Sequence, residues 1–138
     1  MLFGGGIALS ALMQSSGASH WMADSLLEYI PGNHPWLLYL SVALFVIFLS
    51  ELVSNTACAA LLVPLMMTMA SVSGLNPVTM AVLTGLAASC SFMLPVGTPP
   101  NALVYGTGKI PQRTMIRAGL VMNLVSAPLL VLVITLMA

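Results

Sequence analysis

A short polar stretch, Ser54-Asn55-Thr56, carries the side chains best suited to binding chemistry, and it lies between two apolar runs. Neither the run at 35–50 nor the run at 57–70 reaches the ~20 apolar residues that an upright membrane-spanning helix needs. Two short apolar helices that meet at a polar tip are typical of a re-entrant hairpin. The pattern predicts such a hairpin over 36–70, with its tip near the middle of the membrane.

The chemistry available at this tip is ion binding. Ser54, Asn55 and Thr56 are all suitable N-cap residues for the second arm, whose first free N–H groups would point to the tip. The first arm ends at the same place with free carbonyls, so one tip offers donors for an anion and oxygen acceptors for a cation. Glu51 lies one helical turn earlier, and an ionisable residue at such depth indicates function. Two interpretations are open: Glu51 holds the tip through hydrogen bonds, which we favour, or it contacts a ligand.

A second interrupted helix follows the hairpin. The apolar helix expected over 77–94 is broken by 95–101, where two adjacent prolines remove two backbone donors, and a short piece continues over 102–108. This pattern predicts a broken helix over 77–108 whose restart aims N–H groups at the same centre as the hairpin tip. The alternative is an ordinary loop between two helices.

Composition sets the class of the chain. It has 138 residues, of which 59% are hydrophobic and 4% charged, and its mean hydropathy is +1.07. Soluble domains carry about 25% charged residues. We therefore expect an integral membrane protein, and an all-α one, because its apolar runs are long and do not alternate. We assign it, as a multi-pass protein, to the plasma (bacterial inner) membrane. The net charge is zero and no basic patch is present, which argues against a nucleic-acid partner. Cys58 and Cys90 lie in apolar runs and are interpreted as buried thiols.

The remaining segments lie before the hairpin and after the broken helix. Residues 1–19 are interpreted as part of a transmembrane helix rather than a signal peptide, because no Lys or Arg opens them. Residues 20–35 form an interfacial arm and a turn, and 118–138 form the last span, in which Asn123 is interpreted as a packing detail. The basic residues cluster in one loop, which is predicted to be cytoplasmic, so both feet of the hairpin lie outside. They are Lys109, Arg113 and Arg117.

Two features then carry a family resemblance. Residues 88–104, ASCSFMLPVGTPPNALV, resemble position for position the signature of the divalent anion/sodium symporter family, and Ser54-Asn55-Thr56 resembles the second Ser-Asn-Thr motif of that family. Residues 2–6 are similar to the helix before it. The resemblance implies one of two inverted repeats, each with one hairpin and one broken helix. The chain would be the C-terminal repeat, without the N-terminal repeat that holds the first sodium site.

The resemblance also implies residue roles. The substrate-binding residues are expected to be Ser54, Asn55, Thr56, Thr98 and Pro99. The second sodium site is expected to use oxygens of Ser50, Val53, Asn55 and Gly97, several of them from the backbone, which suits a hard cation. The family further implies a homodimer and an elevator-like movement.

The resulting hypothesis is a non-enzymatic carrier. It would transport a di- or tricarboxylate by secondary active transport coupled to sodium, as a fragment that lacks its N-terminal half. Two alternatives stay open: a sodium-independent carboxylate exchanger of the same fold, and a non-transporting membrane subunit. An intramembrane hydrolase that uses Ser54 is disfavoured, because only Glu51 is near enough to activate the hydroxyl. The sequence does not choose among succinate, malate, citrate and sulfate.

Overall fold

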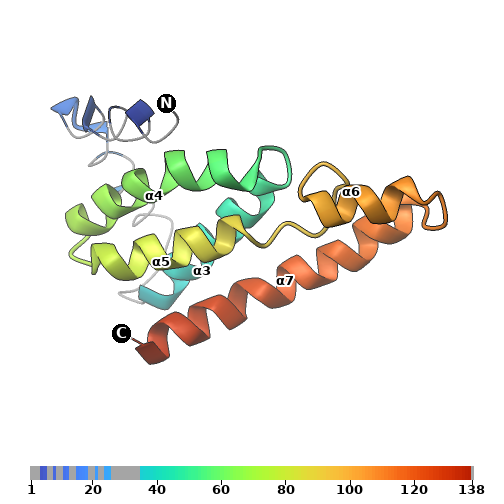
Figure 1. The fold of residues 1–138 in the computed structure, drawn as a ribbon. Helices are drawn as coiled ribbons and strands as arrows, with labels where there is room; N and C mark the ends of the chain where they lie inside the picture. Colours follow the sequence, from blue (N-terminus) through green and yellow to red (C-terminus); the bar gives the residue numbers. More distant parts are fainter. Residues whose placement is uncertain are drawn as a thin grey trace.

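The computed structural model describes residues 35–137 continuously and, before them, positions 4–5, 8, 11–12, 15–18, 21 and 24–25. Most of the two segments expected at 1–19 and 20–35 lies outside the described residues, so these interpretations stay predictions. From residue 35 onward the described chain is all-helical (Figure 1). Its helices are α3 (Pro35–Ser50), α4 (Asn55–Val72), α5 (Pro77–Ala88), α6 (Pro99–Gly106) and α7 (Gln112–Met137).

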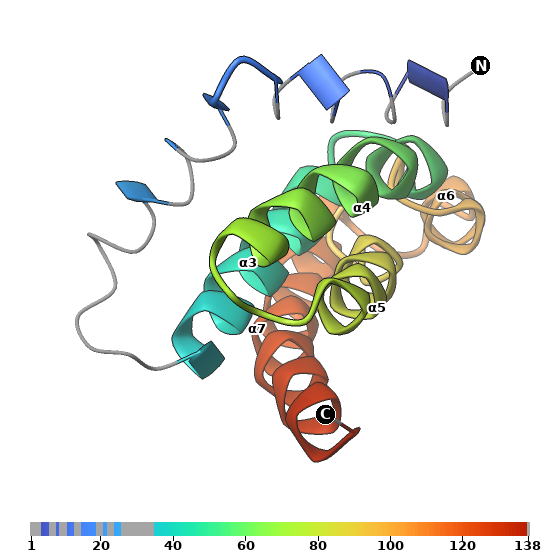
Figure 2. The same cartoon turned by 90° about the vertical axis from the view of Figure 1, so that its left-hand side faces the viewer.

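The helices pack around α5. Figures 1 and 2 show α4 running beside α5, with α7 on the side of the bundle away from α4. The helix α3 packs against both α5 and α7. Apolar side chains from α3, α4, α5 and α7 form one core, whereas α6 contributes no buried residue to it. Fully or almost fully buried members of this core include Val46, Ile47, Cys58, Met80, Leu83 and Ala127.

A tight turn returns the chain from α4 to α5. The N–H of Leu75 donates to the carbonyl of Ala70 over 2.8 Å, and Gly74 has a φ of 71°, which is the left-handed turn that commonly ends a helix. Asn76 then caps α5, since its Oδ1 accepts from the N–H of Val78 at 2.9 Å. Pro77 follows at the first helical position, where no N–H is needed. These local signals place α4 and α5 side by side.

The tip between α3 and α4 lies near the middle of α7. Asn123, close to the midpoint of α7, is hydrogen-bonded to Glu51, which lies just before the tip. With 26 residues, α7 is about 39 Å long, enough to cross a hydrocarbon core of about 30 Å. The outer ends of α3 and α4 lie at one end of the bundle, near the start of α5 and the end of α7 (Figure 1). This arrangement fits a re-entrant hairpin, which stays a prediction.

The broken helix has other bounds than those expected. The helix predicted over 77–94 ends at Ala88, and the restart predicted at 102 begins at Pro99. The early end has a physical cause, because the N–H groups of residues 92–94 donate to a side chain and not to preceding helix carbonyls. Prolines at the first two positions of α6 need no acceptor, so the helix can restart directly on them.

The last helix also starts earlier than predicted. It begins at Gln112 and not at 118, so Arg113 and Arg117 lie on its first turns and only Lys109 belongs to the preceding turn. In the first turn of α7, the N–H groups of Thr114 and Met115 donate to the carbonyl of Pro111 at 3.0 and 3.3 Å. Among the described helices, α4 and α7 are long and apolar enough to cross a membrane, while α3 and α5 are shorter.

Cysteine labelling tests the hairpin arrangement. In a background with Cys58 and Cys90 replaced by alanine, a cysteine at Ser73, just after α4, should react with impermeant reagents from outside only. A cysteine at Asn33 should behave the same way, and one at Gln112 should react from the cytoplasmic side only, since a basic segment stays inside. Reaction of positions 33 and 73 from opposite sides would show that residues 36–70 cross the membrane.

Candidate functional site

A single buried carboxylate organises the centre of the bundle. Glu51 is 4% exposed, and four N–H groups donate to it. Its Oε1 accepts from the backbone N–H of Phe92 at 2.7 Å, the N–H of Met93 at 2.8 Å and the Nδ2 of Asn123 at 2.8 Å. Its Oε2 accepts from the N–H of Leu94 at 2.9 Å. Four donors face this carboxyl group, which is what an acceptor-only carboxylate requires.

These bonds explain how the helix can break in a nonpolar setting. Irregular backbone inside a membrane is tolerated only when its polar groups find partners within the protein. Glu51 accepts the donors of three consecutive residues in the break. Asn101 satisfies the acceptors, since its Nδ2 donates to the carbonyls of Ser91 and Leu94, each at 3.1 Å. The interpretation that Glu51 acts through hydrogen bonds is therefore confirmed, although its partners lie in the break and in α7.

The last helix approaches the break at backbone distance. A Cβ built on Gly119 would lie 2.4 Å from the carbonyl oxygen of Phe92 and 2.5 Å from the Cα of Met93. Asn123, one turn further along the same helix, is 0% exposed and reaches Glu51. The interpretation of Asn123 as a packing detail is wrong, because it is a direct partner of the central carboxylate. A lone polar residue within an apolar helix was the available signal.

The hairpin tip is joined to the break through a side-chain hydrogen bond. Ser54 caps α4, its Oγ accepting from the N–H of Ala57 at 3.2 Å, as predicted. The next residue, Asn55, is half-buried, and its Oδ1 accepts from the Oγ of Ser91 at 3.1 Å. No described residue accepts a hydrogen bond from the backbone N–H of Asn55 or Thr56. The start of α4 thus keeps two free donors.

The predicted donors at the start of α6 are absent. Pro99 and Pro100 have no N–H. The next two N–H groups, of Asn101 and Ala102, both donate to Thr98, to its Oγ1 at 3.4 Å and to its carbonyl at 3.1 Å. The expectation that this restart aims N–H groups at the tip is therefore wrong for these four residues. Only the α4 start retains that capacity in the described site.

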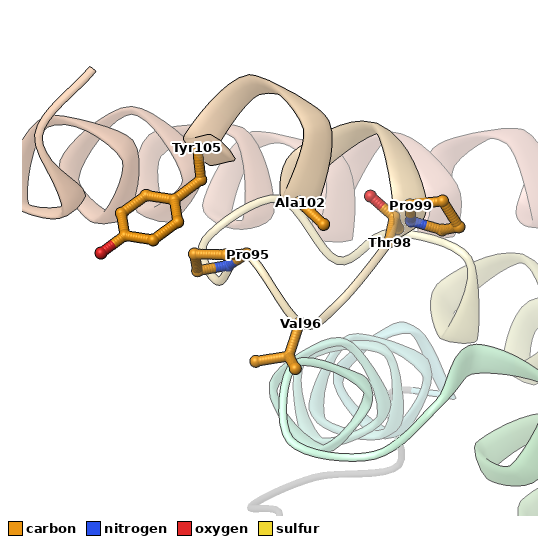
Figure 3. Close-up of a pocket in the computed structure, with 6 residues that line it drawn as sticks. All are labelled: Pro95, Val96, Thr98, Pro99, Ala102 and Tyr105. Atoms are coloured by element: carbon orange, nitrogen blue, oxygen red, sulfur yellow. The ribbon is translucent and has the colours of Figure 1, made fainter. Parts of the chain in front are cut away.

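The predicted substrate residues fall into two groups. Thr98 and Pro99 line an open pocket of about 410 Å³ together with other residues of the break and α6 (Figure 3). Ser54, Asn55 and Thr56 do not line this pocket. No hydrogen bond between described residues joins Ser54 or Thr56 to Thr98 or Pro99. Ser91, to which sequence reasoning had assigned no role, is hydrogen-bonded to Asn55 of the first group. It reaches the second group through Asn101, which donates its Nδ2 to the Ser91 carbonyl and its N–H to the Oγ1 of Thr98.

Of the predicted sodium residues, Asn55 and Gly97 both lie beside Ser91. A Cβ on the buried Gly97 would lie 2.9 Å from the Oγ of Ser91, and that Oγ is hydrogen-bonded to Asn55. The same Cβ would lie 3.3 Å from the Oε2 of Glu51, so Gly97 leaves room at a cluster of oxygens. Ser50, next to Glu51 in the chain, is fully buried, whereas the Val53 side chain is exposed. Within the described residues, no cluster of His, Cys, Asp or Glu suits a transition metal.

Residues 1–137 match the family described as "Sodium:sulfate symporter transmembrane region". The chain belongs to this family. The resemblance seen in the sequence is thereby confirmed, and the matched family is one of membrane transporters and not of enzymes.

Several bacterial transporters are similar to this chain. A Haemophilus influenzae protein named "Uncharacterized transporter" is 51% identical over 125 residues, which cover 91% of this chain and 27% of that protein. The sodium-dependent dicarboxylate transporter SdcS of Staphylococcus saprophyticus is 42% identical over 134 residues, covering 97% of this chain and 26% of SdcS. The SdcS of Staphylococcus aureus strain USA300 is 40% identical over the same length. The chain spans about a quarter of the length of these curated relatives.

Substitution of Glu51 should lower the thermal stability of the bundle in a graded way. Alanine leaves four donors without their acceptor, at about 1–3 kcal/mol for each buried group left unsatisfied. Glutamine keeps one acceptor oxygen, so we expect the order wild type, Glu51→Gln, Glu51→Ala from most to least stable. Melting in detergent measures this order. Asp24→Asn, which removes an acidic charge outside the site, should melt like wild type; equal melting of all four proteins would contradict the assigned role.

Two glycines give a matched test of the close approach at α7. Gly119→Ala places a methyl group 2.5 Å from the Cα of Met93 in the break, so the helix or the break must move, at about 1–3 kcal/mol of overpacking. Gly85→Ala in α5 meets nothing within 4 Å and removes a glycine from a helix interior. It should therefore be neutral or up to about 1 kcal/mol stabilising. The melting temperature of Gly119→Ala should fall below that of wild type, whereas that of Gly85→Ala should stay equal or rise.

Proposed function

We propose that this chain forms one sodium- and carboxylate-binding repeat of a secondary active transporter for a di- or tricarboxylate. In this proposal Ser54, Asn55, Thr56, Thr98 and Pro99 contact the substrate. Oxygens of Ser50, Val53, Asn55 and Gly97 bind a co-transported sodium ion. The names of the two SdcS relatives support a sodium-coupled dicarboxylate carrier.

One observation carries the proposal: the half-buried Asn55 meets the break at Ser91, beside Gly97. An amide has both an acceptor oxygen and donor N–H groups, so it can serve a cation and an anion at once. The free N–H groups of Asn55 and Thr56 lie on the same tip. Helix N-termini of this kind suit a carboxylate, because unsatisfied donors and the helix dipole both favour negative charge.

The charge balance supports a role for sodium. A dicarboxylate brings two negative charges, and Glu51 adds a carboxylate directly behind the tip. The described basic side chains, Lys109, Arg113 and Arg117, are exposed and lie outside this cluster. Of the two helix starts, only that of α4 keeps free N–H groups, and it supplies roughly +0.5 charge. Bound cations would provide the remaining positive charge, which is the physical reason for coupling substrate binding to sodium.

The proposal includes a second, inverted repeat with its own hairpin and broken helix, a homodimeric assembly and elevator-like movement. A related repeat would contribute partial positive charge of similar size toward the second carboxylate. Sites at the interface of two repeats are typical of secondary transporters. The apolar outer face of α7, largely exposed in the described structure, is compatible with burial against lipid or against other parts of the carrier.

Transport in proteoliposomes tests the proposal. A carrier with both repeats should take up labelled succinate, and its apparent affinity should rise with sodium when choline replaces sodium at constant ionic strength. Asn55→Ala should lower that affinity about 5- to 150-fold at near-normal expression, because losing a buried polar contact costs about 1–3 kcal/mol in each bound state.

Asn76, the cap of α5, provides a matched control for Asn55→Ala. Asn76→Ala makes the same truncation at the cap of α5 and should leave the sodium and succinate affinities unchanged. Succinate uptake that ignores sodium would favour the exchanger. Wild-type affinity in Asn55→Ala would contradict the assigned binding tip.

A further inference from the structure

A buried hydroxyl holds one end of the Asn55 amide. Ser91 is 0% exposed, and its Oγ donates to the Oδ1 of Asn55 at 3.1 Å, joining parts of the chain that are 36 residues apart. No described residue accepts a hydrogen bond from the Nδ2 of Asn55. The oxygen end of the amide is therefore held inside the bundle, while its NH₂ end is free.

The two ends of this amide face different surroundings. The oxygen end meets Ser91, whose Oγ lies 2.9 Å from the Cβ position of Gly97. The Oε2 of Glu51 lies 3.3 Å from that same position, so this side is rich in oxygen atoms. Asn55 is only half-buried, and the neighbouring Ser54 and Thr56 are exposed. The NH₂ end, pointing away from Ser91, belongs to the open side of the tip.

We propose that Ser91 is a positioning residue that fixes the orientation of the Asn55 amide, with the oxygen toward the sodium site and the NH₂ toward the substrate carboxylate. This inference rests on the proposed function. In a flipped amide the NH₂ would donate to the Ser91 Oγ, and the buried hydroxyl proton of Ser91 would lose its described acceptor. Loss of that acceptor biases the amide toward the observed orientation.

If Ser91 fixes the amide, the effect of its loss on the apparent substrate affinity should depend on the sodium concentration. Without the Ser91 hydroxyl, two amide orientations become similarly populated, and only one of them binds the carboxylate. The apparent substrate affinity then falls by the competent fraction, about twofold for equal populations. Sodium, by binding the oxygen end, selects the competent orientation and restores the affinity. Loss of Ser91 should therefore matter at low sodium and not at saturating sodium.

The test compares the KM for succinate at limiting and at saturating sodium, in proteoliposomes holding the carrier with both repeats. Ser91→Ala should raise the KM about twofold at limiting sodium and leave it at the wild-type value at saturating sodium. Ser91→Cys keeps a side chain of similar shape with a weaker donor, and it should shift the KM in the same sodium-dependent way. If Ser91→Ala does not fold, the same comparison is made with Ser91→Cys. Ser89→Ala, which removes an exposed hydroxyl that bonds within α5, should change neither value.

The outcomes separate this inference from the proposed function. An equal change in KM at both sodium concentrations would indicate a purely structural role for Ser91 and overturn the inference. An unchanged KM in the Ser91 variants at limiting sodium would overturn it as well. Failure of the wild-type carrier to show sodium-dependent succinate uptake would instead contradict the proposed function.

Discussion

The structure depends on the hydrogen bonds between the Glu51 carboxylate and three consecutive backbone N–H groups of the break. A helix that stops within a nonpolar bundle must find acceptors for the donors it frees, and water is not available to supply them. Here one side chain from a neighbouring element accepts all three, from residues 92–94. The end of α3 and the interruption between α5 and α6 are therefore parts of a single structure, and neither can be altered independently.

The position of α7 follows from the same constraint. Asn123 contributes the fourth donor to Glu51, so α7 must lie close to the break, and Gly119 removes the side chain that would prevent this approach. The carboxylate thus links three elements: the tip after α3, the break after α5 and the middle of the last helix. In a bundle whose charged residues are few, one buried carboxylate with dipolar partners provides this connection without an ion pair among the described residues.

Prediction from sequence succeeded where local chemistry is strong and failed where tertiary contacts decide. The interrupted elements, the polar tip and the Ser54 cap follow from apolar run lengths and capping preferences, and the structure has them. The end of α5 at Ala88 was not predictable, because residues 89–94 are apolar or neutral and the break depends on the bonds of residues 92–94 to the distant Glu51. Asn123 and Ser91 were missed for a related reason: their importance depends on partners 72 and 36 residues away. The absent donors at α6, in contrast, could have been read from the two prolines themselves.

The bonds of the break also restrict which groups are left to bind a ligand. Donors of residues 92–94 are committed to Glu51, and those of Asn101 and Ala102 to Thr98, so none of them is available to an anion. At the start of α4 the N–H groups of Asn55 and Thr56 stay free, while the break brings oxygen atoms and the space left by Gly97. In the proposed carrier the free N–H groups of the tip face the carboxylate together with Thr98 and Pro99, and the oxygen atoms around Gly97 face the cation. Asn55, held at its oxygen end by Ser91, is the residue that belongs to both, so the occupancy of the cation site can act on the anion site through a single side chain.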